Sequence, residues 1–183
     1  MSGFQYFVAS SLDGFIATTD DQLDWLLQFD GFAGGKESYE AFMADVGCIV
    51  MGGDTYAWLR KHEPGTWPYP DTPSWVFTHH EFTAPAGADV TFVRGPVTEF
   101  VEDLRAGAAG RNVWIVGGGN LAAQFADAGA LDEIIISIIP VVLGSGKAVL
   151  PLAGPTAPLE LVASHTMGRG VVELRYGFRR TPA

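Results

Sequence analysis

Three consecutive glycines follow a short apolar run in the stretch VWIVGGGNLAAQF, which begins at Val113. Residues 113–116 predict a buried strand, and the residues after the glycines predict a helix. Backbone without side chains between a strand end and a helix start lets N–H groups approach a phosphate closely. The stretch also matches the dinucleotide-binding pattern G-x-G-x-x-A at Gly117, Gly119 and Ala122. These residue types at this spacing therefore favour phosphate binding.

The position of the glycines argues against an ordinary Rossmann domain. Such a domain carries its glycines in the first strand–helix–strand unit, with an acidic residue about 20 positions later that holds the ribose. Here the glycines lie in the second half of the chain, and residues 137–140 (SIIP) contain no Asp or Glu. The simplest alternative is a tight turn that binds nothing.

Two further predicted strands end in groups that can bind a phosphate or a sugar. In IVMGGDTYAWL two glycines follow the apolar run, and Asp54 or Thr55 can cap the next helix or join a phosphate site. The stretch WVFTHH ends in a hydroxyl and two imidazoles. Because the carboxyl ends of parallel strands meet at one edge of a sheet, three such ends favour one extended, phosphate-bearing ligand over three unrelated turns.

The elements that must position these groups alternate between strands and helices. This alternation predicts an α/β fold with a mainly parallel sheet, helices on both faces and an antiparallel hairpin at one edge. Residues 10–35 and 63–73 are predicted to be loops. Strands are predicted over 4–9, 47–51, 74–78, 89–94, 113–116 and 132–142, and two more within 159–178 with a turn near 168–170. Helices are predicted over 54–61, over 97–107, after the triple glycine, and over 36–46 with Tyr39, Phe42, Met43 and Val46 on one apolar face.

Composition and charge exclude several classes of protein. A length of 183 residues predicts one domain over 1–183, and a formal net charge of −10 disfavours nucleic-acid and anionic membrane partners. Cys48 lies in the apolar run CIVM and is predicted to be a core residue, and no metal site is expected. No signal-peptide pattern is present, and the longest uncharged apolar run, 134–143, is too short to span a bilayer. We expect a cytoplasmic protein.

Five motifs, VASSLDGFIA, IVMGGDTY, VFTHH, VWIVGGGNLAAQF and PVVLGSGKAVL, together resemble the dihydrofolate-reductase-like fold. The chain is most similar to the reductase domain of the bifunctional riboflavin-biosynthesis deaminase-reductases (the C-terminal domain of RibD) and its stand-alone relatives. The resemblance covers nearly the whole chain and implies a three-layer sandwich. It also implies a reductase with a nicotinamide cofactor, NADPH or alternatively NADH, lying across the strand ends. The substrate would be a small pyrimidine- or pterin-like heterocycle that accepts a hydride.

The resemblance assigns sixteen residues to the cofactor. In chain order, the first three flank the nicotinamide, the next four hold one phosphate, the next three lie by the adenosine ribose, and the last six belong to the glycine turn at the other phosphate. They are Ala9, Ile16, Ala17, Gly52, Gly53, Asp54, Thr55, Thr78, His79, His80, Val116, Gly117, Gly118, Gly119, Asn120 and Leu121.

The chain lacks two cations that relatives use at the cofactor. Gly53 and Asn120 stand where relatives often carry arginine, which would hold a 2′-phosphate. His79, His80 and Arg94 are the local replacements, although the two histidines are also typical of a solvated loop. We therefore predict a modest preference for NADPH over NADH, because imidazole is a weaker phosphate partner than guanidinium.

The substrate side is less defined in the sequence. Dihydrofolate reductases place a carboxylate on the first long helix, and the candidates here are Asp30, Glu37 and Glu40, each of which is also typical of a surface charge. Riboflavin-pathway enzymes carry a polar motif for the ribosyl phosphate where this chain has YAWLRKHEPGTWPYP. The aromatic residues of that stretch can line a flatter apolar pocket or pack in the core: Trp58, Trp67 and Tyr69.

These observations lead to one predicted function with two alternatives, and to one predicted oligomeric state. The first is an NAD(P)H-dependent reductase of the riboflavin-reductase type; the alternatives are a dihydrofolate reductase and a nucleotide-binding module without turnover. A homodimer through the C-terminal half is also predicted, because 134–143 carries no charge and 159–178 adds apolar surface at a sheet edge. The alternative is that these strands are central in one sheet.

Overall fold

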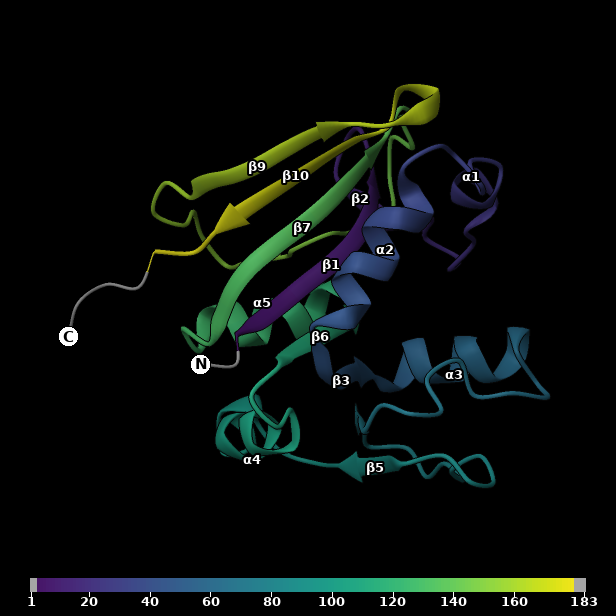
Figure 1. Ribbon diagram of the computed structural model, residues 1–183, viewed down its shortest axis with the longest axis vertical. Helices are drawn as coiled ribbons and strands as arrows, with labels where there is room; N and C mark the ends of the chain where they lie inside the picture. Colours follow the sequence, from purple (N-terminus) through teal and green to yellow (C-terminus); the bar gives the residue numbers. More distant parts are fainter. Residues whose placement is uncertain (1–2, 180–183) are drawn as a thin grey trace.

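An eight-stranded mixed sheet forms the middle layer of the fold, between two layers of helices (Figure 1). The structure is a computed structural model that describes residues 3–179. The strand order in the sheet is β5-β4-β3-β6-β1-β7-β10-β9. These strands are β1 (Phe4–Ser11), β3 (Val46–Gly52), β4 (Ser74–Phe77), β5 (Val90–Val93), β6 (Asn112–Gly117), β7 (Leu131–Ile139), β9 (Glu160–Thr166) and β10 (Val172–Gly177). The remaining elements are β2 (Phe15–Ala17), β8 (Lys147–Ala148), α1 (Asp24–Leu27), α2 (Gly35–Ala44), α3 (Gly53–His62), η1 (Val97–Glu99), α4 (Val101–Gly107), α5 (Gly119–Asp127) and η2 (Gly168–Gly170).

Successive side chains of the buried strands pack alternately against the helices on one face of the sheet and on the other. In β6, Val113 and Ile115 pack against α4 and α5, whereas Trp114 packs on the side of α2 and α3. Figure 1 shows α2 crossing in front of β1 and α5 lying behind the sheet. A strand buried on both faces needs apolar residues at every position, which explains the continuous apolar runs in the sequence. The predicted α/β class, with a mainly parallel sheet and an antiparallel C-terminal hairpin, is confirmed.

The parallel register aligns the carboxyl ends of four central strands. Gly52 at the end of β3 pairs with Phe77 of β4, and Met51 pairs with Gly117 of β6. On the other side of β6, β1 runs parallel to it. The three strand ends singled out in the sequence therefore lie next to one another.

Several predicted boundaries differ from the structure. Val46 was predicted on the apolar face of a helix but is the first residue of β3, because the helix ends at Ala44 and the chain turns at once into the sheet. The single helix predicted over 97–107 is a 3₁₀ turn followed by α4. The predicted loop over 10–35 contains the last residues of β1, all of β2 and α1, and the first residue of α2. β2 and α1 are too short to give a periodic signal in the sequence.

The uncharged run of β7 lies inside the sheet and not at its edge. β7 pairs with β1 on one side and β10 on the other, and Ile134, Ile135 and Ile139 are buried. The strand ends at Ile139, before Pro140, and not at residue 142 as predicted. The actual edge strand at this end of the sheet is β9.

Cys48 is a buried core residue, as predicted, and burial raises the pKa of its thiol to about 12. Within residues 3–179, no helix is long and apolar enough to cross a membrane. The same part of the chain holds no group of three or more His, Cys, Asp or Glu side chains placed to bind a metal ion.

Candidate functional site

A cleft of about 1050 Å³ opens where the carboxyl ends of β1, β3, β4 and β6 meet; we call it the strand-end cleft. All sixteen residues that the sequence resemblance assigned to the cofactor line this cleft. They come from segments as far apart in the chain as Ala9 and Leu121. A cavity of this size can hold a ligand of cofactor dimensions.

Two helix N-termini point their free N–H groups toward the strand-end cleft. α3 begins after Gly52 and α5 begins after Gly118, and neither helix has a side-chain hydrogen bond at its cap. The first N–H groups of a helix lack partners within the helix and carry the positive end of its dipole. Two such ends follow the neighbouring strands β3 and β6, and backbone N–H groups in this arrangement can bind anions.

Glycine is present in the two turns for different structural reasons. A Cβ atom on Gly52 or Gly118 would meet nothing within 4 Å, so their bare backbone borders open space. A Cβ on Gly53 would lie 2.7 Å from Oγ1 of Thr78, so close packing against that buried hydroxyl requires glycine there. The Gly117–Gly118 peptide bond is cis.

A small two-stranded sheet, β2 with β8, borders the strand-end cleft beside the start of α5. β8 packs closely against the start of α5, since a Cβ on Gly119 would overlap the carbonyl oxygen of Ala148. Within the small sheet, a Cβ on Gly146 would overlap the carbonyl oxygen of Ala17. Lys147 of β8 forms an ion pair with Asp21. These contacts hold the 147–151 segment against the glycine turn.

Asp13, in the motif SLDG, anchors the loop that leads into β8. Its carboxylate accepts hydrogen bonds from Ser11 Oγ at 2.7 Å and from the backbone N–H groups of Leu143 and Gly144 at 3.1 and 2.7 Å. The Ser11 hydroxyl, followed by the backbone N–H groups, lowers the pKa of Asp13 below its ordinary value. The ionised carboxylate therefore ties the first cleft loop to the loop before β8.

Replacing Asp13 by Asn is expected to release this loop. The amides of Leu143 and Gly144 should exchange with solvent about tenfold faster, because an amide oxygen accepts these bonds more weakly than a carboxylate. Because the pKa is lower in the folded protein, the anchor is present above the pKa of the unfolded chain and is lost as the pH falls through the folded value. Hydrogen exchange followed by NMR measures this effect. Asp20→Asn, an exposed carboxylate in the same region, should leave both amides unchanged; equal exchange in both variants would contradict the assignment.

The ends of β4 and β5 bring two imidazoles and a guanidinium together at one end of the cleft. Phe77 pairs with Val93, so residues 78–80 lie beside Arg94. Thr78 is buried, and its hydroxyl accepts a hydrogen bond from the His80 N–H at 2.9 Å. Both histidines and Arg94 are exposed at the rim of the cleft.

The aromatic residues of α3 and of the loop that follows it divide between the cleft and the core. Trp58 lines the cleft and stacks on His62 with 4.0 Å between ring centroids, whereas Trp67 is buried and Tyr69 packs against it. Lys61 lines the cleft and was missed in the sequence. Its spacing of three from Trp58 places both on one side of a helix, which is the signal that could have identified it.

The three candidate carboxylates from the sequence do not line the strand-end cleft. Asp30 is exposed and accepts a hydrogen bond from the N–H of Gly31, and Glu40 is exposed and pairs with Lys36 at 3.5 Å. Glu37 is also exposed on α2. The helix that carries two of them presents its charges to solvent.

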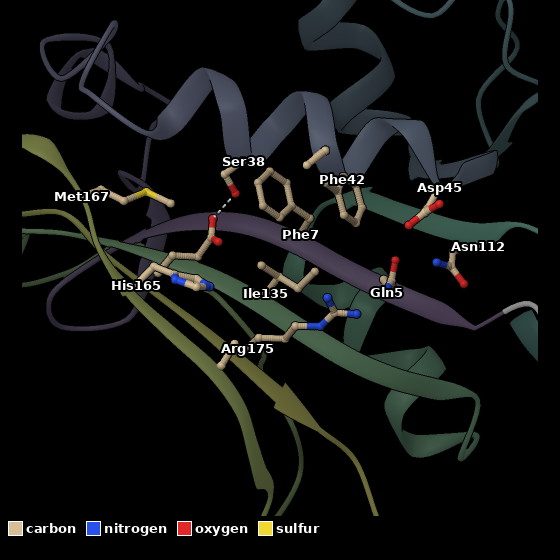
Figure 2. A pocket seen from close by; sticks show the side chains of 13 residues that line it. Gln5, Phe7, Ser38, Phe42, Asp45, Asn112, Ile135, His165, Met167 and Arg175 are labelled. Carbon is tan, nitrogen blue, oxygen red and sulfur yellow. Dashed lines mark hydrogen bonds between the residues drawn. The ribbon is translucent and has the colours of Figure 1, made fainter.

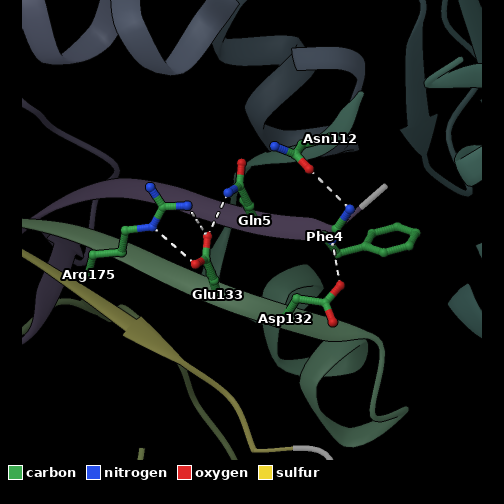
Figure 3. Close-up of polar contacts among 7 residues, drawn as sticks. Phe4, Gln5, Asn112, Asp132, Glu133 and Arg175 are labelled. Carbon is green, nitrogen blue, oxygen red and sulfur yellow. Dashed lines mark hydrogen bonds and ion pairs between the residues drawn. The ribbon is translucent and has the colours of Figure 1, made fainter. Parts of the chain in front are cut away.

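A second cleft, of about 440 Å³, lies between α2 and the sheet strands β1, β7, β10 and β9; we call it the α2 cleft (Figure 2). It contains the buried carboxylate of Glu173, which sequence reasoning missed. At its other end Arg175 pairs with Glu133 at 2.6 Å, and Gln5 Nε2 donates to the same carboxylate at 2.6 Å (Figure 3). Glu173 lies in a strand of mixed polarity, where a single acid gives no sequence signal.

Comparison with known proteins places the chain in a family. The family described as the RibD C-terminal domain matches residues 69–173. The chain is 35% identical over 170 residues to the uncharacterised protein YwjB of Bacillus subtilis (strain 168), covering 93% of this chain and 94% of that protein. A protein of Shewanella sp. PV-4, provisionally named for riboflavin biosynthesis, has a solved structure with a TM-score of 0.80 and 26% identity, covering 97% of this chain and 99% of that one.

One further solved structure is similar to this chain in fold alone. The solved structure of a pyrimidine reductase-like protein from Corynebacterium diphtheriae has a TM-score of 0.67 at 15% identity, covering 98% of this chain and 93% of that one. The family match, the similarity to YwjB and the eight-stranded architecture agree with the resemblance found in the motifs. This chain belongs to the RibD C-terminal domain family.

Proposed function

We propose that the protein is an NAD(P)H-dependent reductase that transfers a hydride to a pyrimidine- or pterin-like heterocycle. The single observation that carries the proposal is the convergence of all sixteen matched residues on one cleft of cofactor size. The family supports reductase chemistry of the riboflavin-biosynthesis type. The strand-end cleft fits a dinucleotide, because two uncapped helix N-termini and the open space beside Gly52 and Gly118 can accept two phosphates.

In this proposal the chain binds and orients, while the cofactor when bound supplies the hydride. The α3 and α5 N-termini hold the pyrophosphate, and Ala9, Ile16 and Ala17 flank the nicotinamide. Small apolar groups at that position let two flat rings approach each other and keep water out. His79, His80 and Arg94 together offer a weak site for a 2′-phosphate, which gives a modest preference for NADPH.

Fluorescence titration and a substrate screen test the proposal. NADPH should quench the tryptophan fluorescence, since Trp58 and Trp114 line the cleft, and NADPH should bind more tightly than NADH by less than about a hundredfold.

NADPH oxidation should then be followed with dihydrofolate and with the ribosylamino-pyrimidinone phosphate of riboflavin biosynthesis. Turnover of dihydrofolate would identify a dihydrofolate reductase. Binding without oxidation of NADPH by any pyrimidine or pterin would identify a nucleotide-binding module.

A homodimer formed through β9 is part of the same proposal. β9 pairs only with β10 in the sheet, and it exposes Leu161 at 54% and Val162 at 53% of their surface. An unpaired edge with apolar side chains is commonly covered, and a second copy about a two-fold axis covers it most simply. Sedimentation at micromolar concentration should give twice the chain mass, and Leu161→Lys should shift it to a single chain. Wild-type protein that sediments as one chain would contradict the dimer.

A further inference from the structure

Glu173 is a buried acid whose partners are neutral. It is 7% exposed, and no other charged side chain within residues 3–179 is as deeply buried. Ser38 Oγ of α2 donates to its Oε2 atom at 2.8 Å (Figure 2), and Ser137 Oγ of β7 donates to the same atom at 3.4 Å. The ion pairs among the described residues do not include Glu173.

The hydrogen-bonding capacity of this carboxylate is only half used. A carboxylate can accept about four hydrogen bonds, and burying one is costly unless donors surround it. Both bonds that the described residues make to Glu173 use Oε2, so Oε1 is available to a donor inside the α2 cleft. The arrangement suits a ligand that brings N–H groups.

The strand register places Glu173 close to the strand-end cleft. Ala9 pairs with Ser137, and Ser137 pairs with Glu173, so the three residues form one row across β1, β7 and β10. Neighbouring strands are about 5 Å apart, so a side chain of Glu173 that reaches Ser137 ends about one strand away from Ala9. Phe7, in the adjacent row, lines both clefts. A ring in the α2 cleft therefore lies beside the position proposed for the nicotinamide.

The walls of the α2 cleft favour a flat ring without a phosphate. Phe7 and Phe42 stack with centroids 4.5 Å apart, and Ile135 lines the floor. Arg175 is paired with Glu133, and the other ionisable side chains of the lining are two acids without an ion pair among the described residues, Glu173 and Asp45, and the imidazole of His165, which lies opposite Glu173 in the β9–β10 register. Two carboxylates without an ion pair disfavour a phosphate in this cleft and favour a ligand with amino groups.

We propose that the α2 cleft binds the heterocyclic substrate and that Glu173 selects a planar ring bearing amino groups, by accepting N–H hydrogen bonds at Oε1. The assignment of this ring as the substrate rests on the proposed function, but the binding site itself does not. Glu173 is thus the specificity-determining residue of the substrate site, supplied by β10 and held in place by the hydroxyl of Ser38.

Isothermal titration calorimetry without cofactor tests the site. The probe is 2,4-diaminopyrimidine, and 2,4-dimethylpyrimidine serves as a ligand of similar shape without N–H donors. The wild-type protein should bind the diamino compound at least about tenfold more tightly, because the dimethyl compound offers no N–H group to the Oε1 atom of Glu173. Glu173→Gln should abolish this preference, whereas Glu160→Gln, at an exposed position of β9, should retain it.

Two outcomes would overturn the proposal: no preference in the wild type, or a preference that survives in Glu173→Gln. A crystal structure of the wild-type complex with 2,4-diaminopyrimidine decides independently of any variant, and should place an amino nitrogen within hydrogen-bond distance of Glu173. A ring found elsewhere would refute the site. NADPH titration separates the two proposals, since a protein that binds the diamino ring at Glu173 but not NADPH would refute the proposed function and support this inference.

Discussion

Replacing Gly118 by valine is expected to weaken NADPH and NADH binding at least tenfold, about 1.4 kcal/mol. Gly118 is the cap residue of α5, and a Cβ there would project into open space within the strand-end cleft. A branched side chain in that space blocks the approach of a phosphate to the backbone N–H groups. The backbone at this position is extended, with φ −82° and ψ 174°, which valine adopts readily. The fold should therefore survive.

The control for this variant is Gly154→Val, in a loop where a Cβ also meets nothing within 4 Å and which does not line the cleft. Fluorescence titration should show wild-type affinity for Gly154→Val and weakened affinity for Gly118→Val, with both variants retaining wild-type circular dichroism. Equal affinity of Gly118→Val and wild-type protein for both nucleotides would contradict the assignment of this turn to the dinucleotide.

Replacing Gly47 by alanine is expected to lower the free energy of unfolding by about 3 kcal/mol. A Cβ on Gly47 in β3 would overlap the carbonyl oxygen of Ala108 at the end of α4, and would also lie 2.9 Å from the Cβ of Arg111. The obstacle is backbone, which also accepts the hydrogen bond from the Arg111 N–H at 3.0 Å, so it cannot rotate away. Either α4 shifts from the sheet or the strand distorts.

Urea denaturation measures this loss, and the thermal midpoint should fall by about 10 °C. The matched control is Gly107→Ala in α4, where a Cβ would meet only the Cys48 sulfur at 4.0 Å. Alanine favours a helix over glycine by up to about 1 kcal/mol, so this variant should be slightly more stable than wild type. Similar stability of Gly47→Ala and wild-type protein would contradict the close packing of α4 on β3.

The glycine-lined strand ends that border the strand-end cleft could be predicted from the sequence because their signals are local. Glycines after an apolar run, as at Gly52 and Gly118, mark a strand end and a helix start whatever lies elsewhere in the chain. In a parallel sheet the carboxyl ends of the strands share one edge, so local signals of this kind are enough to predict a common cleft. The fold class followed from the same apolar runs, since strands buried on both faces leave no polar positions.

The surroundings of Glu173 and Asp13 were decided by the tertiary structure, because their contacts join residues far apart in the chain. Glu173 reaches Ser38 across 135 positions, and Asp13 reaches Gly144 across 131. Glu173 does not differ in its local sequence from exposed acids such as Glu37, and the motif SLDG around Asp13 does not indicate which distant backbone groups it binds. The position of β7 in the sheet could not be predicted from the sequence, since the same uncharged run is typical of a central strand and of an edge strand that a second copy of the chain covers. Strand order and register resolve these cases, because they fix which side chains share a face and which are covered.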